Sequence, residues 1–485
     1  LFMCKRSFVF PAALGAMAAC LTPVMAAAAE GAPAHLPGAE LSVYWAIPFA
    51  CMLLSIALGP MIVPHFWDHH FGKVSVFWGL AFLVPCAIVY GVNTAVFEGL
   101  HSILLDYIPF IVLLFALFTV AGGVRLKGTL VGTPAVNTAM LGIGTVLASW
   151  MGTTGAAMLL IRPLLRANAH RKYRAHQVVF FIFMVANIGG SLTPLGDPPL
   201  FLGYLKGVSF FWTLEHLFHE MLFAAGILLV LFYIIDKVTY IKEGSPKGPN
   251  PAEAAQNGEV EKFGLDGKIN LLLLVCIVLA VLVSGMVDLG VWGTVMGIQL
   301  HGSGIARDLV LLVIAGLSWV LTSRRSRSLN GFTWAPILEV GKLFFGIFLS
   351  MIPAIAILRA GTDGALANLI NLVFHDGHPV NAAFFWLTGA LSSFLDNAPT
   401  YVVFFNTAGG DPAHLMTDMA STLAAISCGA VFMGANTYIG NAPNFMVRSI
   451  AEENGVPMPS FFGYMGWSCG ILVPIFILMT FLFFI

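Results

Sequence analysis

Charged residues are scarce in this sequence. They make up 10% of its 485 residues, whereas hydrophobic residues make up 58% and the mean hydropathy is +0.89. An ordinary soluble chain carries about 25% charged residues. The composition therefore excludes a soluble globular protein and predicts a polytopic membrane protein that is surrounded by the lipid bilayer. The net charge of −1 gives no field that would attract nucleic acid.

Patterned cysteines and catalytic signatures are also missing. The seven cysteines are scattered through apolar segments without a CxxC or Cys/His spacing, which argues against a disulfide framework and a zinc site. No HExxH, GxSxG, GxxxxGKS/T or GxGxxG motif occurs in a suitable context. The chemistry of an intramembrane hydrolase or an ATP-driven pump is therefore absent, and we expect neither an enzyme nor a resident cofactor.

Apolar runs long enough to cross a bilayer follow one another along the chain. They lie near 42–63, 75–95, 104–124, 221–241, 269–287, 308–322, 337–358 and 463–485. Before them, residues 1–28 are typical of a secretory signal, with Lys5 and Arg6 ahead of an apolar run and small residues near Ala26. A first helix that is retained in the mature protein is the alternative.

One long polar segment, 242–268, separates two halves at 42–241 and 269–485. Its Pro, Gly and Glu content predicts a linker. If 42–63 runs from outside to inside, and if 128–168 and 378–405 each return to the side they enter, 18 of the 23 Lys and Arg residues lie inside. The positive-inside tendency then predicts an inner-membrane protein with a cytoplasmic linker.

Each half contains two interrupted apolar stretches, which we interpret as a hairpin and a broken helix. The hairpins are predicted at 128–168 and 378–405, and the broken helices at 177–207 and 421–447. "GSLTPLGDPPLF" from residue 190 aligns without a gap with "GANTYIGNAPNF" from residue 434, and at the same offset of 244 residues "SWMGTTGAAM" aligns with "SFLDNAPTYV". The repeat predicts an all-α polytopic membrane protein in which the two halves have inverted topology, with two re-entrant hairpins and two broken helices.

Two aspartates lie inside the interrupted segments, Asp197 in the first break and Asp396 at the second hairpin tip. A carboxylate at membrane depth is costly unless it is partnered or protonated, so we predict that these two hold a transported Na⁺ or a proton. Neutral oxygens from both halves are expected to complete the site: Thr153, Thr154, Thr193, Asn397, Thr400, Asn436, Thr437 and Asn441. The alternative for each is a structural cap or a contact between helices.

At "TTGAAMLLIRP", "GGSLTPLGDPP", "LDNAPT" and "GANTYIGNAPN" the chain resembles the ion transporter superfamily. That group includes NhaD-type sodium/proton antiporters, arsenite permeases, citrate carriers and sodium-coupled dicarboxylate carriers. The resemblance implies the ion transporter superfamily fold and a homodimer in which a transport domain moves against a scaffold. "LDNAPT" and "PLGD" look more like the antiporter branch, while "GDPP" departs from it.

A sodium/proton antiporter that works by alternating access is the function we predict. Two aspartates would repel a di- or tricarboxylate but would accept Na⁺ and protons in competition. A cation-coupled citrate or dicarboxylate transporter is the alternative, and a membrane enzyme or receptor is a third class. The expected partners are therefore the bilayer, a small inorganic cation or carboxylate substrate, and a second copy of the chain.

Overall fold

The computed structural model describes residues 35–128, 130–246 and 264–485. The signal predicted for residues 1–28 lies outside the described residues, as does most of the predicted linker. Helices account for 74% of the structure. The strands of the described part form three short antiparallel pairs, so the protein is all-α, as predicted.

The first half consists of nine α-helices and three shorter helical turns in the described residues. The α-helices are α2 (Ile47–Ile62), α3 (Pro64–Val89), α4 (Val92–His101), α5 (Ile108–Ala121), α6 (Pro134–Met151), α7 (Thr153–Ala167), α8 (Ala175–Met184), α9 (Pro198–Leu205) and α10 (Trp212–Lys242). The turns are the 3₁₀-helices η1 (Val43–Ala46) and η3 (Ile188–Ser191) and the π-helix η2 (Ser102–Tyr107).

The second half follows with twelve α-helices in the described residues. They are α12 (Ile269–Met286), α13 (Gly302–Leu321), α14 (Arg324–Leu329), α15 (Ala335–Ser350), α16 (Ile352–Arg359), α17 (Ala367–Val373), α18 (Asn381–Phe394), α19 (Asn397–Thr407), α20 (Pro412–Met416), α21 (Ala420–Met433), α22 (Ala442–Glu453) and α23 (Phe461–Phe483).

 The remaining turns are the 3₁₀-helices η4 (Gly361–Asp363) and η5 (Gly434–Asn436).

All eight predicted spans correspond to helices. Seven helical segments in the described residues are long and apolar enough to cross a membrane, and α15 with α16 makes an eighth if this bent pair is one span. The pair bends by 44° where Pro353 enters the first turn of α16, because proline cannot continue the hydrogen bonding of the preceding helix. The chain is therefore a polytopic membrane protein.

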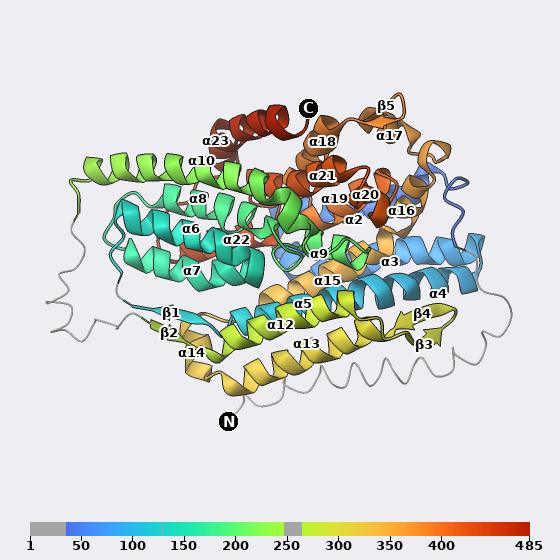
Figure 1. Ribbon diagram of the computed structural model, residues 1–485, viewed down its shortest axis with the longest axis horizontal. Helices are drawn as coiled ribbons and strands as arrows, with labels where there is room; N and C mark the ends of the chain where they lie inside the picture. The colour runs from blue at the N-terminus through green and yellow to red at the C-terminus, as the bar shows by residue number, and fades with distance from the viewer. Residues whose placement is uncertain (1–34, 129, 247–263) are drawn as a thin grey trace.

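The two interrupted stretches of each half fold as a helical pair and a broken helix. In Figure 1, α6 and α7 reach the middle of the molecule from one end, and α18 and α19 reach it from the other. Gly152, with φ of 80°, joins α6 to α7, and Leu395 and Asp396 join α18 to α19. The broken helices are α8–η3–α9 and α21–η5–α22.

The offset of 244 residues also relates hydrogen bonds in the two halves. The Thr193 hydroxyl donates to the Ser149 carbonyl, and the Thr437 hydroxyl donates in the same way to the Ser393 carbonyl. Leu195 N and Ile439 N then donate to these two threonine oxygens, each at 3.2 Å. The gapless alignment of the sequence thus corresponds to the same local structure in both breaks.

Two glycines allow each break to close on itself. A Cβ atom on Gly196 would lie 2.2 Å from the Gly190 carbonyl oxygen, and one on Gly440 would lie 2.6 Å from that of Gly434. Both pairs are again related by 244 residues. A side chain at Gly196 or Gly440 would therefore push the backbone of the break apart.

Short strands pair at several loops, and one pair involves the predicted linker. Strand β1 (Arg125–Lys127) pairs with β2 (Gly264–Asp266), while β3 (Val291–Val295) pairs with β4 (Ile298–His301) and β5 (Phe374–His375) with β6 (His378–Pro379). Asp266 lies 2.7 Å from Lys127 Nζ and 3.3 Å from Arg125 Nη1. The last residues of the 242–268 segment are thus attached to the first half.

We predict that Gly196→Ala destabilises the protein, because the new methyl group overlaps the Gly190 carbonyl. Overpacking of this kind costs about 1–3 kcal/mol. The measurement is the unfolding temperature of the purified protein in detergent. Gly226→Ala on α10 is the control, because a Cβ there has no atom within 4 Å and alanine favours a helix. Equal unfolding temperatures for the two variants would contradict the close approach.

We also predict that the β1–β2 pair opens in acid. The hydrogen bond from Lys127 lowers the pKa of Asp266 below its ordinary value, and Arg125 acts in the same direction. The carboxylate therefore stabilises the strand pair above its unfolded-state pKa of about 3.9, and this contribution is lost as the pH falls through the lower folded-state pKa. Hydrogen exchange at residues 125–127 measures it, after correction for intrinsic rates. Asp266→Asn should remove this pH dependence.

Candidate functional site

Four helices begin at the centre of the molecule. Thr153 and Asn397 are the first residues of α7 and α19, while Asp197 and Asn441 immediately precede α9 and α22. Neither Asp197 nor Asn441 caps its own helix with its side chain. The side chains are thus available to one another, in a region where helix N-termini contribute partial positive charge.

The carboxylate of Asp197 binds the other three side chains. Its Oδ1 accepts hydrogen bonds from Thr153 Oγ1 at 3.1 Å and Asn441 Nδ2 at 3.2 Å, and its Oδ2 accepts one from Asn397 Nδ2 at 2.5 Å. All four residues are buried, and Asp197 is 2% exposed. Both hairpins and both breaks therefore meet at one carboxylate.

The four residues are two pairs that the repeat relates. Asn397 is the equivalent of Thr153, and Asn441 is the equivalent of Asp197, each at an offset of 244 residues. The pseudo-symmetry thus places equivalent positions face to face, but only one of the four carries a charge. Asp197 lies on the first break, and its equivalent on the second break is a neutral amide.

No cationic side chain in the described part of the chain forms an ion pair with Asp197. Its observed donors are two amides and a hydroxyl. Close by, Asn397 Oδ1 is buried without a hydrogen-bond partner among the described residues. A buried carboxylate and an unused amide oxygen are the ligand types that hard cations prefer.

Asp396 lies beside this centre but has a different environment. Its side chain is half-buried, and its Oδ1 accepts a hydrogen bond from Ala398 N at 3.1 Å. It therefore caps α19, the structural alternative that was left open for it. Its repeat equivalent is Gly152, which turns the first tip by positive φ. The two tips thus use different means to start their second helix.

The other predicted site residues mostly bond to the backbone. Thr193 and Thr437 hold the two breaks, and Thr400 Oγ1 donates to the Asp396 carbonyl at 3.0 Å. Asn436 Nδ2 donates to Ser393 Oγ at 2.9 Å, and its Oδ1 is buried without a partner among the described residues. Thr154 is half-buried, and no hydrogen bond of its side chain is found in the described structure.

A family model described as "Putative citrate transport" matches residues 38–484. The match covers nearly the whole chain. The chain belongs to this citrate-transport family. No curated protein is significantly similar to it.

Membership of the citrate-transport family confirms the resemblance to citrate-transporter-like membrane proteins. It also supports a transporter role, which agrees with the spans and the broken helices. The transported species is a separate question, because the family description names citrate whereas the centre of this chain holds a carboxylate of its own.

Two asparagines connect the breaks and were missed by the sequence analysis. Asn187 Nδ2 donates to Asn444 Oδ1 at 2.7 Å, and Asn444 Nδ2 donates to the carbonyls of Gly434 and Thr437 at 2.8 and 2.9 Å. Asn441 Nδ2 also lies 3.2 Å from Asn187 Oδ1. Asn187 and Asn444 have apolar repeat equivalents, Val431 and Leu200, so the repeat carried no signal for them.

Ser149 and Ser393 could have been found, because they begin the two aligned stretches at the hairpins. Ser149 Oγ donates to the Gly189 carbonyl at 2.5 Å, and Ser393 Oγ donates to that of Met433 at 3.1 Å. Their symmetry in sequence thus marked a pair of structural contacts rather than a pair of ligands.

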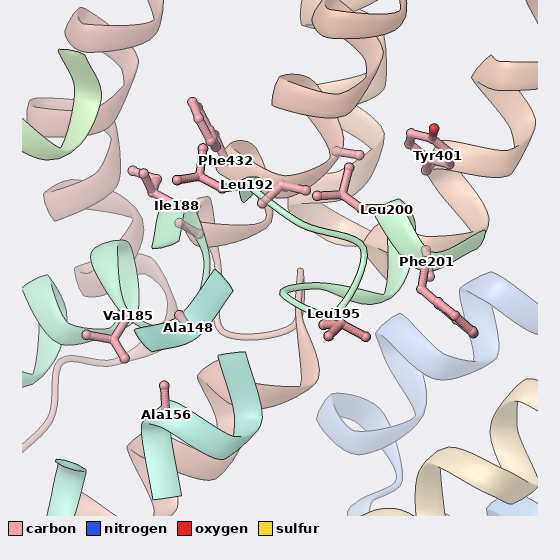
Figure 2. Close-up of a cluster of buried hydrophobic side chains, with 14 of the residues drawn as sticks. Ala148, Ala156, Val185, Ile188, Leu192, Leu195, Leu200, Phe201, Tyr401 and Phe432 are labelled. Atoms are coloured by element: carbon pink, nitrogen blue, oxygen red, sulfur yellow. The ribbon is translucent and has the colours of Figure 1, made fainter. Parts of the chain in front are cut away.

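Apolar side chains surround the first break. Figure 2 shows Leu192 and Leu195 on the break, with Phe432 near one end of it and Phe201 and Tyr401 near the other. All five belong to the same buried core. This shell keeps water away from the polar backbone of the break, so the hydrogen bonds to Asp197 lie in a medium of low dielectric constant.

An ion pair links α9 to the π-helix η2. Lys206 Nζ, at the end of α9, lies 2.5 Å from Asp106 Oδ1. Both residues line a cavity of about 340 Å³ that also includes His101 and Arg359.

We predict that this ion pair couples α9 to the neighbouring span energetically. Lys206→Gln should destabilise the protein by about 1–3 kcal/mol, since it leaves a largely buried carboxylate without its cation. Exchanging the charges, with Lys206→Asp and Asp106→Lys together, should recover part of the loss. The measurement is the unfolding temperature of Lys206→Asp, of Asp106→Lys and of the double variant. Additive effects of the two single changes would contradict the coupling.

Proposed function

We propose that this chain is a secondary transporter that exchanges Na⁺ for protons at Asp197. The observation that carries the proposal is a fully buried carboxylate that has three neutral donors and no cationic partner among the described residues. Asp396, the other predicted ion ligand, then contributes its negative charge from beside the site, where it caps α19.

Electrostatics supports a cation at this position. A buried charge without a counter-charge costs several kcal/mol, and neutral hydrogen bonds offset only part of that cost. Either a proton or a bound cation would neutralise Asp197. A site that holds one or the other, and that moves across the membrane only when occupied, exchanges the two ions.

The pseudo-symmetry of the site supports alternating access. Asp197 contacts residues from both hairpins and from the second break, so movement of either half relative to the other changes its surroundings. Two structurally equivalent halves of opposite direction provide two equivalent ways to open the site. Hairpins that enter from opposite ends of the molecule (Figure 1) fit this behaviour.

A citrate-type carrier is the second candidate, and two observations favour it. The family description names citrate, and four helix N-termini at the centre would favour an anion. In this chain, however, the anion at the N-termini is Asp197 itself. A di- or tricarboxylate would meet this resident negative charge, and for that reason we place cation exchange first.

We further propose an orientation with the linker in the cytoplasm of a cell whose inner membrane holds the protein. The end of the molecule with β1, β2 and α14 carries Arg125, Lys127, Arg324 and Arg325. This agrees with the positive-inside tendency. A homodimer stays a prediction from the family resemblance.

The test is proton movement in everted membrane vesicles that contain the protein. Adding Na⁺ or Li⁺ should dissipate an established pH gradient. Asp197→Asn should abolish this response, because an amide can bind neither a proton nor a cation with balanced charge. Asp396→Asn should weaken the apparent Na⁺ affinity about tenfold, or about 1.4 kcal/mol, while asparagine still caps α19.

Asp363→Asn is the matched control, since Asp363 is exposed in the turn η4 and far from the helix starts in sequence. It should transport like the unmodified protein. Full cation-driven proton movement in Asp197→Asn would refute the proposal. Uptake of labelled citrate without any cation-linked proton movement would favour the second candidate instead.

A further inference from the structure

A cleft lies at the cytoplasmic end that we propose, between the end of α10 and the start of α8. Its volume is about 410 Å³. Its lining includes Lys172, Tyr173, Arg174, Lys242, Pro457 and Trp467. These residues come from the loop before α8, the last residue of α10, the loop after α22, and α23. The cleft is therefore formed where segments distant in sequence meet.

Asp236 and Glu243, which follow lining residues of the cleft in the sequence, already have hydrogen-bond donors. Asp236 accepts hydrogen bonds from Arg171 Nη2 at 2.9 Å and His176 Nε2 at 2.8 Å. Glu243 Oε2 accepts one from Arg171 Nε, and its Oε1 accepts one from Tyr173 N, both at 2.6 Å. Arg171, which is buried, thus contacts both acids from the inner side, and its single charge balances one of them. The three lysine and arginine charges of the cleft exceed the one negative charge that is left.

Three cations then remain on the cleft. Lys172, Arg174 and Lys242 form no ion pair within the described ranges. Arg174 Nη2 donates to the Gly455 carbonyl at 2.9 Å, while its Nε is buried without a partner among those residues. Unbalanced cations around a concave surface attract an anion.

Aromatic and apolar groups border these cations. Lys172 Nζ and Lys242 Nζ lie 5.3 and 5.9 Å from the centre of the Tyr173 ring, and Trp467 stands on α23. On α10, Val238 and Ile241 are 62% and 60% exposed and neighbour the cleft-lining positions. Lysines with aromatic rings beside an exposed apolar helix surface are typical of the level of lipid headgroups.

We propose that this cleft binds the phosphate headgroup of an anionic phospholipid, with the acyl chains along the exposed surface of α10. The three cations supply charge for the phosphodiester, and the rings supply the interfacial contacts. A lipid bound here contacts α8, α10 and α23 together. It therefore joins one arm of the first broken helix to two membrane spans, independently of which substrate the protein transports.

The test uses the purified full-length chain in a neutral detergent. Phosphatidylglycerol should raise its unfolding temperature and remain bound in native mass spectrometry. Phosphatidylcholine and inorganic phosphate should do neither at equal concentration. The variant Lys172→Gln/Arg174→Gln/Lys242→Gln should bind phosphatidylglycerol at least tenfold more weakly.

The control variant Lys237→Gln/Arg324→Gln/Arg325→Gln removes the same charge from exposed residues that do not line the cleft. It should bind phosphatidylglycerol like the unmodified protein. An equal loss in both variants would overturn the proposal, as would protection by inorganic phosphate alone. Binding that appears only after residues 247–263 are deleted would also overturn it, because that segment would then be the occupant.

Discussion

A break in a membrane helix leaves backbone amides and carbonyls without partners, and the rest of this structure depends on how they are satisfied. Water cannot supply the missing bonds in the core of a bilayer. Thr193 and Thr437 bond to the hairpin backbone in both halves, and Gly196 and Gly440 let each break fold tightly onto itself. Each broken helix therefore requires its neighbouring hairpin, which explains why the two occur as a unit and are repeated.

The same breaks create the candidate site. Four helices begin near the middle of the molecule, and the residues at their starts contact one another. A single carboxylate lies where the partial positive charges of the helix N-termini favour an anion. The repeat supplies the geometry, while one of its asymmetric positions, Asp197 opposite Asn441, supplies the charge. Ion binding in this interpretation comes from a departure from symmetry within a symmetric frame.

Different polar interactions occur at the two ends of the molecule. At one end, Lys206 and Asp106 attach α9 to a neighbouring span. At the other end, Arg171 forms ion pairs with Asp236 and Glu243, and three further cations line a cleft. The two arms of the first broken helix, α8 and α9, thus have ion pairs near their outer ends. At their inner ends, the break has hydrogen bonds from uncharged donors.

Composition and apolar run length by themselves determined the membrane class and the eight spans, because a bilayer imposes its thickness on each span. The gapless repeat at 244 residues located both breaks, since proline and glycine mark them locally. Only the tertiary structure decided that Asn397 and Asn441 reach Asp197 while Asp396 caps its own helix. Likewise, the contact between Asn187 and Asn444 and the pairing of β2 with β1 had no sequence signal. Side-chain direction at a helix start depends on packing between distant segments, and no local pattern encodes that packing.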